Sequence, residues 1–204
     1  PLHGLARLLA DGAKDPTFGD EGVVLVEPDV TMIFGHAFTD GAHTLALQPD
    51  GRILVGGGFL SIQGIPLPGL ARLLPNGSVD SSFDIGSGTL PPYDGFHPGT
   101  VRNLRLLPDG RMMVGGYFGW INDRPMPSLA RLLPDGAVDP SFQPGIGRWG
   151  FDIRNGIADL AILPDGQMIV VGDFFRLNRE EWYGYDDPSL TVARLDRDGT
   201  YDPY

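Results

Sequence analysis

The apolar positions of this chain fall in short runs that end at one recurring turn signal. Residues 129–142 read LARLLPDGAVDPSF, and similar phrases start at Leu5, Leu70 and, with drift, Val192. In each copy, four or five largely apolar residues precede an Asp-Gly or Asn-Gly pair, and a second short run follows. Two such runs around a turn pair indicate two antiparallel strands of a hairpin. We call this sequence the ARL phrase.

A second phrase has the same form. It reads LRLLPDGRMMVGGYF from Leu104, has relatives starting at Leu45 and Leu160, and is called the PDG phrase below. The Arg of the ARL phrase stands at positions 7, 72, 131 and 194, so successive copies are 65, 59 and 63 residues apart. The PDG phrases lie between them. The sequence therefore predicts a repeat of about sixty residues with two hairpins in each period.

The seven turn pairs predict one common geometry. Proline precedes five of the seven pairs. Proline presets the first turn dihedral, Asp or Asn suits the second position, and Gly takes the positive φ that follows, which predicts a type I turn closed by a glycine bulge. Seven hairpins predict about fourteen strands, and no segment has a clear helical period. The turns are Asp11-Gly12, Asp50-Gly51, Asn76-Gly77, Asp109-Gly110, Asp135-Gly136, Asp165-Gly166 and Asp198-Gly199.

The turn geometry also predicts a cross-strand ion pair in every ARL phrase. If Leu9 and Ala13 flank the first loop, Arg7 lies opposite Asp15. Such a pair contributes about 0.2–1 kcal/mol when exposed, and between packed sheets it fixes register more than stability. The arginines could instead bind anions, but strand residues that recur in every repeat usually serve the repeat itself. The predicted structural pairs are Arg7–Asp15, Arg72–Asp80, Arg131–Asp139 and Arg194–Asp202.

Two hairpins per period favour a four-stranded antiparallel sheet as the repeating unit, stacked face to face with its neighbours. Such a sheet is a β-propeller blade, longer than the commoner blades of about forty to fifty residues. The continuously apolar residues 53–55, 112–114 and 168–171 suit strands buried on both faces. The Gly-Gly pairs at 56–57 and 115–116 allow close backbone approach. An open solenoid of the same hairpins is the rival architecture.

The paired phrases resemble a known family. The pattern LxPDGxxxVGGxF followed by LARLxxDGxxDxxF is similar to the delta-60 repeat, a tandem β-propeller-type repeat of large bacterial proteins, and the resemblance covers residues 5–204. It implies a bacterial protein that is extracellular or at the cell surface. It implies no activity, because the family offers no established catalytic residues to carry over. The family's Asn-Gly after the Gly-Gly-x-Phe strand is kept only loosely, as Gln63-Gly64, Asn122-Asp123 and Asn178-Arg179.

The number of phrases does not fit a closed ring. We expect one repeat array over residues 1–204, with repeats near 5–69, 70–128 and 129–189 and a partial repeat at 190–204. Four ARL phrases and three PDG phrases make three and a half periods, whereas closed propellers have four or more blades. Three explanations are compatible with this count: the chain is a fragment of a longer array, its ends overlap with another copy in an assembly, or the array is open. We favour a fragment or an assembling subunit over a self-contained ring. Terminal hairpins would then offer edges for strand addition.

Composition narrows the classes of partner. The net charge of −11 argues against nucleic acid, because phosphate binding needs clustered Lys and Arg, and it disfavours anionic membranes. No apolar run reaches the length of a membrane span. The absence of cysteine excludes disulfides, thiol nucleophiles and zinc–thiolate sites, but it leaves the compartment open. The chain starts at Pro1 without a signal peptide, as a processed or partial product would.

Ligand binding is expected in the inserts that differ between repeats. The inserts at 19–43, 84–100 and 143–156 are rich in aromatic residues and Asp. An aromatic face stacks on a sugar ring and a carboxylate accepts its hydroxyl hydrogen bonds, so these inserts could bind carbohydrate; alternatively, the aromatics anchor the loops to blade edges. The first insert contains Phe34, His36, Phe38 and Asp40, and the candidate ligand-binding residues are Tyr93, Asp94, His97, Trp149, Asp152 and Trp182.

The last insert, residues 178–189, is the most acidic and aromatic stretch. Calcium prefers several oxygen ligands on a flexible loop, and this insert offers four carboxylates without EF-hand spacing. A solvated loop is the simpler interpretation. The candidate calcium ligands are Glu180, Glu181, Asp186 and Asp187, and no other cofactor is expected.

No catalytic constellation stands out. The histidines at 3, 36, 43 and 97 do not recur in register, and no carboxylate pair is marked out by its context, although a glycosidase needs only two carboxylates. We therefore expect a non-catalytic β-propeller-type repeat module of a bacterial surface or extracellular protein, serving assembly, adhesion or ligand display. Its expected partners are other copies of itself or further repeats of a longer chain. The alternative is a carbohydrate-binding or glycosidase-like propeller that acts on glycans through the aromatic and acidic loops.

Overall fold

The chain is all-β, as its sequence predicts. The computed structural model describes residues 4–33, 36–90, 99–147, 156–176 and 190–203, and every regular element in these ranges is a β-strand. Accordingly, no helix in the described ranges is long and apolar enough to cross a membrane.

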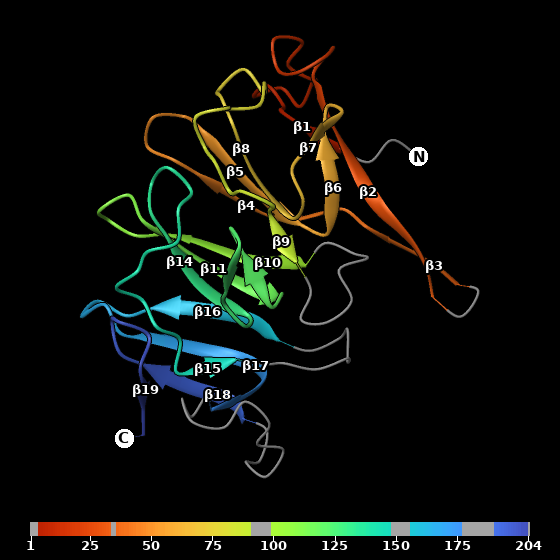
Figure 1. Cartoon of the computed structure of the whole chain (residues 1–204). Helices are drawn as coiled ribbons and strands as arrows, with labels where there is room; N and C mark the ends of the chain where they lie inside the picture. The colour runs from red at the N-terminus through yellow and green to blue at the C-terminus, as the bar shows by residue number, and fades with distance from the viewer. Residues whose placement is uncertain (1–3, 34–35, 91–98, 148–155, 177–189, 204) are drawn as a thin grey trace.

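Three sheets of the same construction follow one another along the chain (Figure 1). In each, a PDG phrase forms the two inner strands and the ARL phrase after it forms the third. The fourth, outer strand is β19 in the last sheet and a single bridge in the other two, Leu73↔Val79 and Leu132↔Val138. Blade 1 contains β4 (Ala42–Leu47), β5 (Ile53–Gly57) and β8 (Leu70–Leu73); blade 2 contains β10 (Thr100–Leu106), β11 (Met112–Tyr117) and β14 (Leu129–Leu132); blade 3 contains β16 (Ile157–Ile162), β17 (Met168–Arg176), β18 (Leu190–Leu195) and β19 (Tyr201–Asp202).

The first ARL phrase forms an outer half-blade ahead of blade 1. Its strand β1 (Gly4–Ala6) corresponds to β8, and its bridge Leu8↔Lys14 corresponds to the outer bridge of blade 1. Strand β10 packs against β4 and β5, and β16 packs against β10 and β11, so the blades stack in chain order. Strands β1 and β19 lie at opposite ends of this stack (Figure 1).

The inserts supply strands that the sequence does not predict. The segment after each ARL hairpin pairs with the strand after the Gly-Gly position of the next blade: β2 with β6, β9 with β12, and β15 with the end of β17. Much of the first insert, expected to be a variable loop, is therefore a long hairpin of β2 and β3. The additional strands are β2 (Val23–Ile33), β3 (His36–Asp40), β6 (Phe59–Ile62), β7 (Ile65–Pro66), β9 (Thr89–Leu90), β12 (Trp120–Ile121), β13 (Arg124–Pro125) and β15 (Ile146–Gly147).

The seven turns adopt the predicted geometry. In the first turn, Leu9 N donates to Ala13 O at 2.8 Å and Gly12 N donates to Leu9 O at 2.9 Å. The glycine of every turn has a positive φ, from 84° at Gly51 to 101° at Gly136. This left-handed backbone closes the glycine bulge and is readily adopted only by Gly, which explains why each phrase contains it.

The hydrophobic cores lie between successive blades. Leu54 on β5 belongs to the core between blades 1 and 2, and the next residue, Val55, belongs to the core between the half-blade and blade 1. Met113 on β11 likewise faces blade 3, whereas Met112 and Val114 face blade 1. Alternate strand residues thus pack on opposite neighbours, which is why these strands read as apolar throughout.

The Gly-Gly positions set the distance between backbones. A Cβ placed on Gly56 would lie 2.5 Å from Val101 Cγ1 of blade 2, and one on Gly57 would lie 2.0 Å from Gly41 O of its own blade. The first glycine therefore admits the first strand of the next blade, and the second admits the bulged strand beside it. In blade 3 the first of these two positions is occupied by Val171.

Candidate functional site

The ARL phrase builds a polar cluster around its arginine. In blade 1, Arg72 Nε donates to Asp80 Oδ2 at 2.8 Å, and Nη2 donates to Ser82 Oγ at 3.1 Å. The third nitrogen, Nη1, reaches the next blade and donates to Pro134 O at 2.6 Å. The guanidinium lies over the Phe83 ring, 4.7 Å from its centroid. We call these groups the arginine cluster; it joins two strands of one blade to the turn of the next.

The cluster recurs in register. Arg7 lies 2.8 Å from Asp15 and donates to Pro75 O of blade 1 at 2.6 Å. Arg131 lies 2.7 Å from Asp139 and donates to the backbone carbonyl of Arg197 in blade 3. Arg194 lies 2.7 Å from Asp202. The structure thus brings together all four Arg–Asp pairs at the positions that the turn register predicts.

Sequence reasoning missed the other members of the cluster. The hydroxyl residue two positions after the Asp and the Phe three positions after it are visible in the repeated words DPTF, DSSF and DPSF. That signal was sufficient to predict a hydroxyl acceptor and an aromatic partner for each arginine. The carbonyl in the next blade had no such signal, because every residue carries a backbone carbonyl.

Burial distinguishes the inner clusters from the terminal ones. The side chains of Arg72 and Arg131 are 8% and 7% exposed, whereas those of Arg7 and Arg194 are 38% and 37% exposed. In the described structure, each inner arginine lies in a sheet with its own PDG hairpin and has a blade after it, whereas Arg7 lies in the half-blade and Arg194 in the last blade. All three nitrogens of Arg72 are hydrogen-bonded to protein oxygens, which favours a structural role over anion binding.

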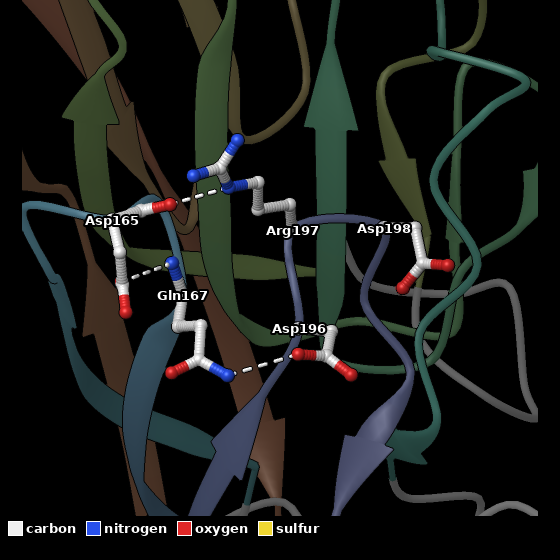
Figure 2. Close-up of a pocket in the computed structure, with 5 residues that line it drawn as sticks. All are labelled: Asp165, Gln167, Asp196, Arg197 and Asp198. Atoms are coloured by element: carbon white, nitrogen blue, oxygen red, sulfur yellow. Dashed lines mark hydrogen bonds between the residues drawn. The ribbon is translucent and has the colours of Figure 1, made fainter.

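A polar hollow lies between the two turns of blade 3 (Figure 2). Arg197 Nε donates to the backbone carbonyl of Asp165, and Gln167 Nε2 donates to Asp196 Oδ1 at 2.9 Å. Asp198 also lines the hollow, but Thr200 N and Oγ1 donate to its Oδ1 at 3.0 and 2.7 Å, as expected for a turn carboxylate. Within the described ranges, no three His, Asp or Glu side chains are grouped to hold a metal ion. These interactions maintain the turns and point to no reaction.

An unfinished blade interface lies on β4 of blade 1. Leu45 and Leu47 are 55% and 70% exposed, whereas Leu104 and Leu160, the counterparts of Leu45 in blades 2 and 3, are 2% and 3% exposed. Leu104 shares a core with Leu54 of the preceding blade, and Leu160 shares one with Met113. The half-blade contributes only outer strands to the described structure and has no counterpart of Leu54. We call Leu45 and Leu47 the open β4 face.

Comparison with known families agrees with this architecture. The model of a family described as a domain of unknown function (DUF5122) beta-propeller matches residues 4–18, 48–83 and 107–142. The first segment is an ARL phrase, and each of the others begins within a PDG phrase and ends with the following ARL phrase. The chain is a β-propeller-type repeat array. No curated protein and no solved structure matches it.

Within the propeller-type array, the cluster carboxylates are held in their charged form. Burial alone would raise the pKa of Asp139, but hydrogen bonds from the Ser141 hydroxyl and amide, and from Arg111 and Arg131, lower it far below its usual value. The pKa of Asp80 is lowered for the same reasons by Ser82 and Arg72, against the effect of burial. Protonation of either group must therefore break several hydrogen bonds.

The lowered pKa values predict acid sensitivity. A carboxyl whose pKa is lower in the folded than in the unfolded chain stabilises the fold above its unfolded pKa of about 3.9 and loses that contribution as the pH falls below it. We therefore expect the free energy of unfolding, measured by urea titration, to decrease steeply below about pH 4. Asp139→Asn should make this decrease shallower, since it removes one titrating group. An unchanged slope in the variant would show that the pKa of Asp139 does not control acid stability.

The other candidates from the sequence lie elsewhere in the propeller-type array. The strand residues His36 and Phe38 belong to β3, and Asp40 ends it, so the first insert presents a hairpin there. The remaining candidates lie outside the described residues and stay predictions: Phe34, Tyr93, Asp94, His97, Trp149, Asp152 and Trp182 for sugars, and Glu180, Glu181, Asp186 and Asp187 for calcium.

Proposed function

We propose that this chain is a non-catalytic structural module of delta-60-type propeller repeats in a bacterial surface or extracellular protein. Its role is assembly with further blades of the same kind, and adhesion or ligand display builds on that scaffold. The observation that carries this proposal is the open β4 face. The counterparts of Leu45 in the other blades are buried against a neighbour, and those of Leu47, Leu106 and Ile162, are partly buried there.

The distribution of charge supports the same role. In the first three ARL phrases, the recurring arginine and aspartate are engaged with each other, with a hydroxyl side chain and with the next blade. An arrangement that recurs from blade to blade is expected to stabilise the stack of blades, whereas a reaction centre would be built at one place. An acidic surface, with a net charge of −11, suits a soluble extracellular scaffold that does not bind nucleic acid.

The accessibility of the open β4 face tests the proposal. We expect the folded chain to increase the fluorescence of anilinonaphthalene sulfonate, and Leu45→Ser/Leu47→Ser to lower that signal by about half or more, because the dye binds exposed apolar surface. The melting temperature should change little, since both side chains are largely in water. Leu60→Ser/Ile65→Ser is a matched control, because these residues are 43% and 46% exposed on β6 and β7.

Carbohydrate assays test the alternative function. The propeller-type module is expected to migrate through polysaccharide-containing native gels at its control rate and to release no sugar from soluble glycans. Retardation or hydrolysis, combined with dye binding that does not depend on Leu45 and Leu47, would contradict the assembly role. That combination would favour the carbohydrate-binding or glycosidase-like interpretation of the aromatic inserts.

A further inference from the structure

The blade that should cover the open β4 face is already half present. Arg7 Nη1 donates to Pro75 O at 2.6 Å, as Arg72 Nη1 donates to Pro134 O at 2.6 Å in the next interface. Gly19 N also donates to Asn76 O at 2.7 Å. The half-blade therefore occupies the outer half of a blade position against blade 1. The inner half of that position is where Leu45 and Leu47 are exposed.

The half-blade and the first insert cover another part of the same side of blade 1. Val55 and Leu73 of blade 1 are fully buried in a core with Phe18 and Val24. In the two complete interfaces, the counterparts of Leu45 are covered by the second strand of the PDG hairpin in the preceding blade. Leu54 shares a core with Leu104, and Met113 shares one with Leu160. Only this inner hairpin is lacking opposite β4 in the described structure.

We infer that the open β4 face binds the inner hairpin of a blade of this repeat type, a two-stranded PDG segment that has no outer strands of its own. This inference rests on the proposed assembly function and names its partner. An entire blade from a second copy does not fit, because its β18 and β19 would occupy the space of the half-blade.

The face also defines the residues that the hairpin needs. It must present an apolar side chain at the position of Leu54 and Met113, which pack on Leu104 and Leu160 in the complete interfaces. The position of Gly56 is less restricted here. In the complete interfaces this glycine faces Val101 or, as Gly115, Ile157, but the corresponding residue of β4 is Ala42. A side chain at that position would therefore meet the smaller Ala42 in place of Val101 or Ile157.

The absence of cysteine provides a direct test. In Leu47→Cys the thiol is the only one in the chain, and it should react rapidly with a water-soluble disulfide reagent. In a second version, residues 99–127 are repeated directly ahead of Gly4 in place of residues 1–3, which restores the order of PDG and ARL phrases. We expect thiol reactivity to fall at least about tenfold and the melting temperature to rise by about 5 °C or more.

Two controls separate specific docking from general protection. Leu60→Cys on β6 should react equally in the original and extended chains, because the added hairpin does not cover it. The extended chain with Met113→Asp in the added copy should regain the fast reaction of Leu47→Cys. If the extended chain does not fold, a synthetic peptide of residues 99–117 added to Leu47→Cys should slow the reaction, and the Met113→Asp peptide should not.

The possible outcomes test the inferred partner and the proposed assembly function separately. If neither extension nor peptide protects the Leu47→Cys thiol, the inner hairpin is not the partner, while dye binding at the open β4 face still supports assembly. If the thiol is already protected in the original chain and light scattering shows a dimer, a second copy covers the face and the inference is overturned. Failure of the dye and carbohydrate tests would instead overturn the proposed function itself.

Discussion

Replacing Asp139 by alanine is expected to lower the free energy of unfolding by about 3–5 kcal/mol. The carboxylate lies 2.7 Å from Arg131 and 2.9 Å from Arg111. Because the Arg131 side chain is only 7% exposed, the variant leaves a buried guanidinium without its counter-ion. The loss of stability comes from the desolvation penalty of the Arg131 charge, which the carboxylate no longer offsets. It is therefore larger than the modest net contribution of the ion pair to folding.

The Asp139 pairs lie within blade 2, and an exposed ion pair that joins blade 2 to blade 3 provides the comparison. Asp159 lies 2.8 Å from Arg105, and the two side chains are 61% and 42% exposed. Asp159→Ala should therefore cost at most about 1 kcal/mol in urea unfolding at neutral pH. Asp139→Ala/Arg131→Met should recover part of the loss, because it removes the unpaired charge as well. Equal costs for Asp139→Ala and Asp159→Ala would show that the arginine cluster does not hold the blades in register.

Gly115→Val is expected to destabilise the interface of blades 2 and 3 by about 1–3 kcal/mol. A Cβ at this position lies 3.0 Å from Ile157 Cγ2 and 3.2 Å from Leu160 Cδ2, so a larger side chain must push β16 away. Ile157→Ala removes the closest atoms. The double variant should therefore be more stable than the sum of the two single losses predicts, as a thermal unfolding series can measure.

Blade 3 provides the matched control for this prediction. Val171 occupies the position of Gly115, but it lies on the side of blade 3 that faces away from blade 2. Val171→Gly should therefore leave the blade 2–blade 3 interface intact and cost about 1 kcal/mol or less beyond the intrinsic effect of glycine in a strand. Additive losses for Gly115→Val and Ile157→Ala would show that close packing of these two residues does not set the blade spacing.

Local features of this fold were predictable from its sequence. The type I turns, the glycine positions and the Arg–Asp pairs depend on residues within eight positions of each other, and the repeated phrases state them several times. The all-β blade follows from the same phrases. The strands of the first insert were missed because β2 has its partners in β1 and β6, which its own residues do not indicate.

Contacts between blades were less accessible from sequence. Arg72 reaches a backbone carbonyl 62 residues later, and no residue type marks such an acceptor. The count of four ARL and three PDG phrases indicated an incomplete array, yet the exposure of Leu45 and Leu47 followed only from the stacking order of the blades. The sugar and calcium candidates of the inserts remain predictions, because their residues lie outside the described ranges.

The arginine clusters all point in one direction along the chain. Arg7, Arg72 and Arg131 each donate to a carbonyl that is made 68, 62 or 66 residues later. A blade that leaves the ribosome therefore has its own turns and Arg–Asp pair, but the carbonyl that accepts from its arginine is synthesised only several seconds later, in the next blade. Synthesis from the N-terminus closes these contacts one at a time and in order. Each newly emerged blade is thus the least protected part of the nascent protein, and a pause in synthesis exposes that blade rather than those already made.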